Sequence, residues 1–264
     1  ILPADARGRV DWSALPGALR PNTRVLVCAH GSNVTGNLND LSALGAFCAE
    51  HGLIFVVDAA QTGGVLPIHM EQMHIDLLCL TGHKGLLGPQ GIGALLVGEN
   101  VDLRPVRVGG TGVQSALKTQ PAQYPARLEA GTLNGPGIAG LGAALAWLDA
   151  QNEKELRRRE QGFARRFYEG VRDLPGVTCY GDFEAPERCP IVSLNLGDWD
   201  SAAVSDELWT RFGIVTRAGL HCAPLAHEAL GTARQGAVRF SLSHLNTENE
   251  IDRGIDAMRT LATE

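Results

Sequence analysis

A single lysine follows one of the most apolar short segments of the chain. The run Ile75–Leu80 leads directly into Thr81, His83 and Lys84. A flexible amine delivered to the carboxyl end of a core strand is well placed to form an imine with an aldehyde cofactor. A lysine that served only to keep the protein soluble would not be expected at the end of a core strand. Lys84 is therefore the first candidate for covalent chemistry.

A carboxylate occupies the corresponding place one segment earlier. The apolar run Leu53–Val57 is followed by Asp58 and Gln61. An anionic side chain there could pair with a ring nitrogen of the cofactor that Lys84 binds. The alternative role of Asp58 is a turn or helix cap, and His83 taken alone has a structural alternative too. The conjunction of these groups carries the hypothesis.

Strands must position these side chains. A third apolar run, Arg24–Ala29, ends in His30 and Asn33, and its composition predicts a strand covered on both faces. Helical spacing at 38–50 and a further strand at 91–97 predict an α/β fold with parallel pairing wherever a helix crosses over. Ligands of such sheets collect beyond the carboxyl ends of the strands, so we expect these polar groups to share one crevice.

The second half of the chain has a different pattern. An aperiodic Gly/Thr/Pro-rich stretch at 105–135 precedes a helix at 136–149 and a mixed-charge run at 151–160, which predicts a solvated helix face. Short strands then alternate with helices. We expect strands at 177–180, 190–196, 214–217 and 237–243, and helices at 201–212 and 247–262. This predicts a large domain at 1–150 and a smaller α+β domain at 151–264.

Composition narrows the classes of function. The 264 residues are 44% hydrophobic and 20% charged, with a formal net charge of -6, which argues against nucleic acid as the main partner. No apolar run is long enough to cross a bilayer, and no secretory signal is visible. The six cysteines form no CxxC pair, so we expect reduced thiols and a reducing, cytoplasmic compartment.

Four segments together resemble a known family. Asp58–Gln61, Thr81–Gly93 and Glu129–Asn134 are similar to the class V aminotransferase group of pyridoxal-phosphate enzymes. Arg217–Pro224 resembles the active-cysteine loop of SufS-like cysteine desulfurases and selenocysteine lyases. The resemblance implies a fold-type I transferase: a large domain with a mostly parallel sheet, incomplete at its amino-terminal side, and a smaller α+β carboxyl-terminal domain.

The resemblance also implies roles around a cofactor ring. Lys84 would hold pyridoxal 5'-phosphate as an imine and later shuttle a proton. Asp58 would pair with the pyridine nitrogen and make the ring an electron sink. Gln61 would hydrogen-bond the phenolic oxygen, and Asn33 would lie near that oxygen and the substrate carboxylate.

Further roles concern the phosphate and the assembly. By the same resemblance, Thr81 and His83 would contact the cofactor phosphate, and His83 would also belong to the catalytic residues. Thr132 would reach the phosphate held by a partner subunit, which implies a homodimer. No metal ion is expected in this chemistry.

A cysteine and two arginines complete the predicted site. The resemblance implies that Cys222 attacks the sulfur of the bound substrate, helped by His221 or a cationic neighbour that favours the thiolate. A small buried hydrophobe is the alternative for this cysteine. Arg239 places a charge in an apolar strand, where it binds the substrate carboxylate or forms an internal salt bridge. Arg217 is a secondary candidate with a structural alternative.

The predicted function is a cysteine desulfurase that converts L-cysteine to L-alanine and passes persulfide sulfur from Cys222 to an acceptor protein. Another class V enzyme (selenocysteine lyase, aminotransferase or epimerase) and an inactive remnant acting as a dimerisation module are the alternatives. The acceptor and the pathway, whether iron–sulfur cluster assembly, tRNA thiolation or selenium recycling, stay open.

The start of the chain adds one expectation. The first residue is Ile1, and the resemblance implies about a hundred further residues before it. Those residues would supply a Gly/Thr phosphate-binding turn and a histidine stacked on the ring. His30 does not match that histidine, so we expect the chain by itself to bind the cofactor poorly.

Overall fold

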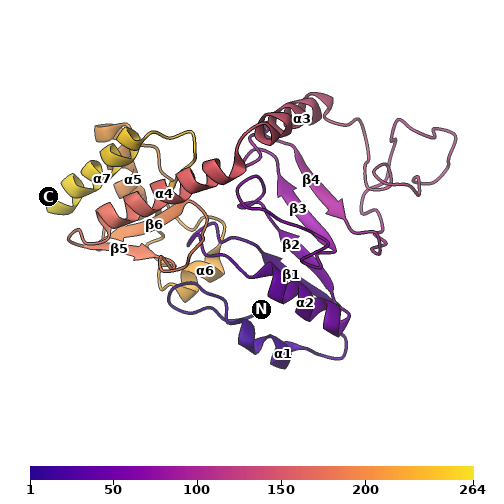
Figure 1. Ribbon diagram of the computed structural model, residues 1–264, viewed down its shortest axis with the longest axis horizontal. Coiled ribbons are helices and arrows are strands. Elements are labelled where there is room, and N and C mark those ends of the chain that lie inside the picture. The colour runs from indigo at the N-terminus through magenta and orange to yellow at the C-terminus, as the bar shows by residue number, and fades with distance from the viewer.

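The computed structural model describes residues 1–264 and contains two β-sheets with helices packed against them (Figure 1). The strands of the first sheet are β1 (Val25–Ala29), β2 (Ile54–Asp58), β3 (Leu77–Thr81) and β4 (Gly93–Val97). Those of the second are β5 (Val177–Tyr180), β6 (Ile191–Leu196) and β7 (Val238–Ser241).

Seven α-helices and one short 3₁₀ helix, Trp12–Ala14, connect and cover the sheets. The α-helices are α1 (Leu15–Ala18), α2 (Leu41–His51), α3 (Gly135–Asp149), α4 (Glu153–Val171), α5 (Ser201–Phe212), α6 (Pro224–Ala229) and α7 (Glu248–Thr263). None of them combines the length and the apolar character that a membrane-spanning helix needs.

The first sheet has the mostly parallel pairing expected of an α/β fold. Strands β1, β2 and β3 are parallel, and β4 pairs antiparallel with β3. Helix α2 provides the crossover from β1 to β2. It begins at a cap in which the Asp40 side chain accepts from the Ala43 amide, and it ends at Gly52 with φ 62°. The carboxyl ends of three strands therefore lie along one edge.

Burial of the first sheet is one-sided. Phe55 and Val57 are fully buried in the same cluster as Leu44 of α2. On β1, however, Val25 is 45% and Val27 is 65% exposed. The prediction that this strand is covered on both faces is therefore wrong for this chain. Alternate residues of a strand point to opposite faces, and α2 covers only one of them.

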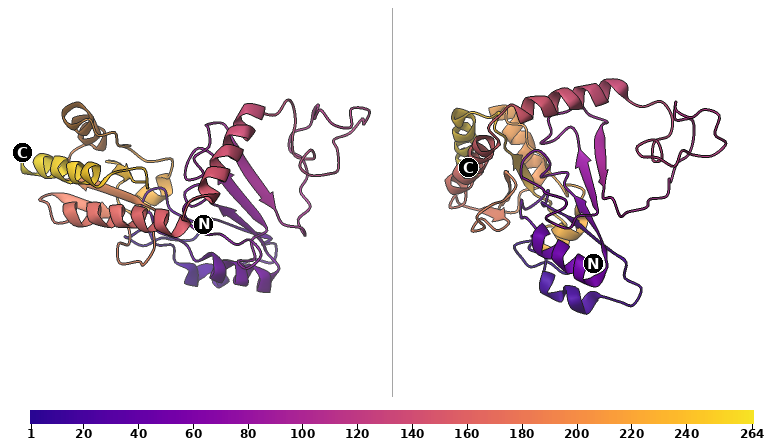
Figure 2. Two further views of the ribbon diagram at one scale, coloured as in Figure 1. Left: turned by 45° about the horizontal axis from the view of Figure 1, so that its top comes forward. Right: turned by 45° about the vertical axis from the view of Figure 1, so that its right-hand side comes forward.

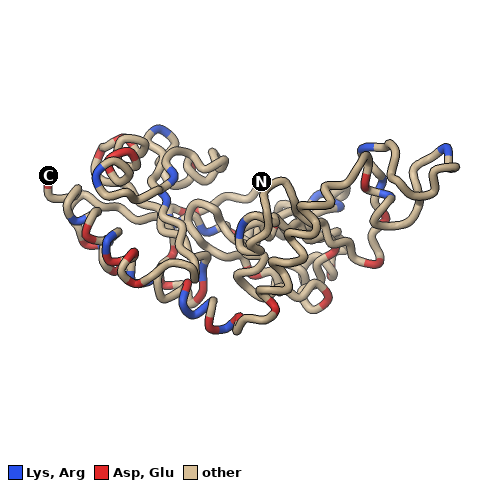
Figure 3. Tube along the Cα trace, turned by 90° about the horizontal axis from the view of Figure 1, so that it is seen from above, with Lys and Arg blue, Asp and Glu red and all other residues tan.

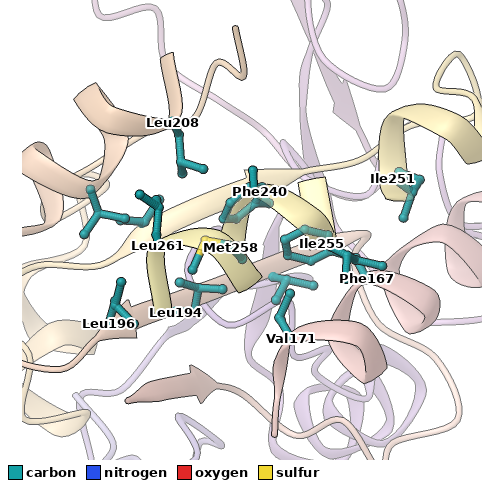
Figure 4. Close-up of a cluster of buried hydrophobic side chains, with 14 of the residues drawn as sticks. Phe167, Val171, Leu194, Leu196, Leu208, Phe240, Ile251, Ile255, Met258 and Leu261 are labelled. Atoms are coloured by element: carbon teal, nitrogen blue, oxygen red, sulfur yellow. The ribbon is translucent and has the colours of Figure 1, made fainter. Parts of the chain in front are cut away.

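The second sheet is entirely antiparallel, and its core is formed with α4, α5 and α7 (Figure 4). Phe167 of α4, Leu194 of β6 and Met258 of α7 are at most 1% exposed. Helix α7 begins with a capping box in which Thr247 and Glu250 exchange hydrogen bonds with each other's backbone amides. This core fixes the strand β7 that carries Arg239.

Two expectations for this half have different outcomes. The solvated face predicted for the mixed-charge run is present on α4, where Arg158 pairs with Glu155 in solvent. The strand predicted at 214–217 is wrong, because only Arg217 pairs, through one isolated bridge to Arg239. Residues 214–216 follow the left-handed cap Gly213 directly and make no ladder.

The long segment 98–134 between β4 and α3 contains no helix or strand and extends away from both sheets in every view (Figures 1 and 2). It exposes apolar side chains, among them Val106 at 98% and Val108 at 69%. Acidic and basic residues are intermingled along the chain (Figure 3). Helices α3 and α4 join the two sheets, and a domain boundary at residue 150 between them stays a prediction.

Candidate active site

The carboxyl ends of the parallel strands bring Asp58 and the Lys84 turn to the same edge of the first sheet. Asp58 ends β2, where it pairs in register with Ala29 of β1 and Cys79 of β3. Strand β3 ends at Thr81, three residues before Lys84. The turn is tight, because a Cβ on Gly82 would lie 2.7 Å from the Ile92 side chain. The predicted shared edge is therefore present.

The electrostatic environment of Lys84 links it to four other predicted residues. Desolvation is the main cause that lowers the pKa of its amine from the ordinary 10.5. The Asp58 carboxylate opposes this shift, as does Cys222, whereas Arg239 and Arg217 strengthen it. Asp58 ends a strand of the first sheet, Arg239 lies in a strand of the second, and Arg217 and Cys222 lie on the loops before α6, so groups from both halves of the chain act on one amine. A lowered pKa increases the share of neutral, nucleophilic amine.

The position of Asp58 is compatible with both roles considered for it, a turn cap and an anionic partner of the cofactor. Its Oδ1 accepts a hydrogen bond of 2.8 Å from the Ala60 amide, which is the turn-capping interaction. Its side chain is nevertheless exposed at the strand end and acts on Lys84. The cap fixes the direction of the carboxylate, so the two roles are compatible.

The segment after β1 is held by the second sheet. The Ser193 hydroxyl donates to the carbonyl of Val34, and the buried Arg188 guanidinium donates to the carbonyl of Thr35. Asn33 lies immediately before these residues. Its position is therefore determined by the small-sheet half of the chain as much as by β1.

Asn33 itself connects the predicted substrate residues. Its Nδ2 donates to the His221 carbonyl at 2.6 Å, and its own carbonyl accepts from Arg239 Nη1 at 3.0 Å. One amide hydrogen of Asn33 is thus engaged within the chain. Its Oδ1 and the second amide hydrogen remain for the cofactor and substrate contacts that were predicted.

Arg239 is partly buried and has no carboxylate partner. Its Nε is buried without a hydrogen-bond partner, and desolvation together with Arg217 lowers the pKa of the guanidinium. An internal salt bridge was the alternative, and the structure contains none at this residue. A partly buried guanidinium without an anionic partner fits a substrate carboxylate.

Cys222 lies exposed on the loop before α6, so it is not the small buried hydrophobe that was the alternative. Arg217 Nη2 donates to its Sγ at 3.3 Å. The contact places a positive charge directly beside the sulfur. His221 and Cys222 have φ of 52° and 59°, a left-handed conformation that costs non-glycine residues about 1–3 kcal/mol each.

Of the two neighbours considered for the Cys222 thiol, His221 and a cationic group, the one that contacts the sulfur is the cationic Arg217. Burial lowers the pKa of His221 to about 4, so its imidazole is neutral near pH 7. The ring also bonds away from the thiol, to the Arg217 carbonyl and to His227. Arg217, which had a structural alternative, makes the contact with sulfur.

The remaining predicted residues have no contact that assigns them a role. Gln61 is half-buried, Thr81 is half-buried at the end of β3, and His83 is exposed. Thr132 is exposed in the segment that extends away from both sheets. Their contacts with a cofactor or a partner subunit stay predictions.

Sequence reasoning missed His227 and Thr232. His227 is fully buried on α6 and bonds His221 and Thr232. The spacing of six residues to His221 crosses a loop and a helix start, so no helical or strand period could relate the two rings. Two histidines around Pro224 in an otherwise apolar segment were the only available signal.

The residues at the sheet edge fit a pyridoxal-phosphate group by their chemistry. An amine, a carboxylate and amide groups lie at one edge. Arg239 Nε has no hydrogen-bond partner within the chain, so this guanidinium can bind an anionic ligand. The structure brings together no group of three or more His, Cys, Asp or Glu residues that could hold a metal ion.

Comparison with known sequences identifies a family over nearly the whole chain. The family model for class-V aminotransferases matches residues 1–253. A probable cysteine desulfurase of Methanothermobacter thermautotrophicus is 32% identical over 95% of this chain and 64% of its own length. A cysteine desulfurase of Pectobacterium carotovorum is 33% identical over 99% of this chain and 64% of its own. The chain thus spans just under two thirds of these relatives.

Solved structures lead to the same family. An apo cysteine desulfurase from Thermococcus onnurineus superposes with a TM-score of 0.87 and 28% identity, over 100% of this chain and 66% of that one. The Escherichia coli cysteine desulfurase CsdA, in an S-sulfonic acid form, gives 0.89 and 29%, over 99% and 64%. The predicted fold-type I architecture is therefore confirmed, and this chain belongs to the class V aminotransferase family.

Proposed function

We propose that this chain carries the catalytic groups of a pyridoxal-phosphate-dependent cysteine desulfurase. The proposed reaction converts L-cysteine to L-alanine and leaves the sulfur as a persulfide on Cys222. The observation that carries the proposal is the convergence of Asp58, Arg239 and Cys222 on the amine of Lys84. Relatives named cysteine desulfurase support it.

The cofactor would be held by residues from both sheets. Lys84 would provide the covalent attachment, Asp58 would bind the pyridine nitrogen, and Gln61 and Asn33 would lie beside the phenolic oxygen. Thr81 and His83 would bind the phosphate. Class V aminotransferases use pyridoxal phosphate, which when bound supplies an electron sink for charge at the substrate α-carbon.

The side chains of this chain would then divide the work. Arg239 binds the substrate carboxylate with its free guanidinium edge, and Asn33 fixes the loop beside it. Lys84 Nζ, freed by the substrate amine, moves the proton at the α-carbon, and its lowered pKa suits it to this transfer. Cys222 Sγ, held in place by the contact with the Arg217 guanidinium, attacks the substrate sulfur.

The exposure of Cys222 suits delivery of sulfur to another molecule. A persulfide on an exposed loop is accessible to a thiol of an acceptor protein, so we include such a partner in the proposal. We further propose a homodimer in which Thr132 of the extended segment contacts the phosphate of the second subunit. The apolar side chains exposed on that segment support this assembly.

The test replaces the thiol alone. In the purified cofactor-bound protein, Cys222→Ser should abolish alanine release from cysteine and the persulfide detected by mass spectrometry, while the visible absorbance of the bound cofactor stays. Cys179→Ser is the matched control, because this thiol lies outside the site and should be dispensable. Full alanine release by Cys222→Ser would reject the desulfurase mechanism and favour another class V reaction.

A further inference from the structure

Two imidazole rings are buried behind the loop that carries Cys222. His221 is 2% exposed and His227 is fully buried. His221 Nδ1 lies 3.3 Å from His227 Nε2, and His227 Nδ1 lies 2.7 Å from Thr232 Oγ1. At the other end, His221 Nε2 lies 3.0 Å from the Arg217 carbonyl. The proposed reaction gives no role to His227 or Thr232.

The direction of this hydrogen-bond chain is fixed by its last group. A carbonyl oxygen can only accept, so His221 must carry its proton on Nε2 and donate it to Arg217. Its Nδ1 is then an acceptor, and His227 must donate to it from Nε2. His227 Nδ1 is left to accept from the Thr232 hydroxyl. Every nitrogen in the two rings is satisfied in this single arrangement of neutral tautomers.

The hydrogen-bond chain is connected to Cys222 in two ways, through Arg217 and through His221. The carbonyl that His221 holds belongs to Arg217, whose guanidinium contacts Cys222 Sγ. His221 is also the residue that precedes Cys222, and both have left-handed backbone conformations. Such a strained pair persists only where its surroundings fix it. The ring of His227 is the buried support behind the first of the two residues.

We propose that His227 is a positioning residue that, through His221, holds the thiol of Cys222 against the guanidinium of Arg217. A role of His227 in sulfur transfer rests on the proposed function. Its effect on the reactivity of the Cys222 thiol does not, and it can be measured without substrate. Loss of the donor at His227 Nε2 frees the His221 ring and lets the loop leave its strained conformation.

Two substitutions of similar chemistry distinguish this role from simple packing. The amide nitrogen of a glutamine reaches the place of Nε2, so His227→Gln keeps a donor for His221. The amide of an asparagine reaches only the place of Nδ1, so His227→Asn keeps the Thr232 contact and loses the one to His221. Both variants keep a polar side chain on the same helix.

The readout is the rate at which iodoacetamide alkylates Cys222, followed by peptide mass spectrometry without substrate. His227→Asn should react about fivefold more slowly than the wild type, the effect of one lost buried hydrogen bond. His227→Gln should stay within about twofold. Fully buried Cys189 reports on the fold in the same samples and should stay unmodified.

Three results would overturn the inference: equal rates in both variants and the wild type, an equal loss in both variants, or a slow Asn variant in which Cys189 becomes reactive. The proposed function can fail separately. If Cys222→Ser keeps alanine release while His227→Asn still slows alkylation, the positioning role stands and the desulfurase mechanism does not.

Discussion

Acid should destabilise this protein through histidines that are buried without charge, among which His30 and His221 have large pKa shifts. His30 is 8% and His221 is 2% exposed, and burial lowers the pKa of each from 6.5 to about 4. The unfolded chain therefore binds more protons than the folded one between these two values. Stability is complete above about pH 6.5 and is lost as the pH falls toward 4.

The size of the effect follows from these values. Near pH 5 an unfolded imidazole is almost fully protonated, whereas the folded one is almost neutral. The difference costs about 2 kcal/mol of unfolding free energy for each histidine relative to pH 7.5. We expect about 4 kcal/mol for the pair, measured by urea denaturation at the two pH values.

A single variant separates His30 from other acid effects. His30 Nδ1 lies 2.9 Å from Thr62 Oγ1. An asparagine places its amide near that nitrogen, so His30→Asn should keep the hydrogen bond and lose the titration. The variant should lose about 2 kcal/mol less than the wild type on acidification. An identical loss in the two proteins would refute the assignment of this pH dependence to a buried neutral ring.

Three further substitutions have defined outcomes. Arg217→Met should slow alkylation of Cys222 by iodoacetamide about tenfold, because a charge-assisted contact to sulfur is lost, whereas Arg259→Met on the exposed face of α7 should have no effect. Arg239→Lys should raise KM for cysteine about tenfold with little change in kcat, since an ammonium cannot make the bidentate contact; an unchanged KM would place the carboxylate elsewhere. Leu194→Ala should lower the unfolding free energy by about 2–5 kcal/mol, and Leu245→Ala, 67% exposed, by less than about 0.5, in denaturant titrations.

Periodicity predicted the elements well where side-chain burial repeats along the chain. The strand before Lys84, helix α2 and helix α7 each have an apolar pattern that a single partner surface covers. The strand expected at 214–217 is absent because no partner surface covers it. Its residues are apolar enough for a strand, but pairing depends on a neighbour that only Arg217 finds.

The candidate site was predictable where strand ends determine position. Asp58 and Lys84 follow from the rule that ligands collect at the carboxyl edge of a parallel sheet. The contact between Arg217 and Cys222, and the rings behind them, depend on how a loop packs against α6. Such contacts join residues with no common period, so only the folded structure reveals them.

The most direct test of the account is the location of the cofactor on the chain. The full-length protein is incubated with pyridoxal phosphate near pH 7, reduced with borohydride and digested, and the pyridoxyl group is found by mass spectrometry. The lowered pKa of Lys84 and the Asp58 carboxylate that acts on it predict that this residue carries the label in preference to Lys118 and Lys154. Equal labelling of the three lysines, or none on Lys84, would contradict the central claim.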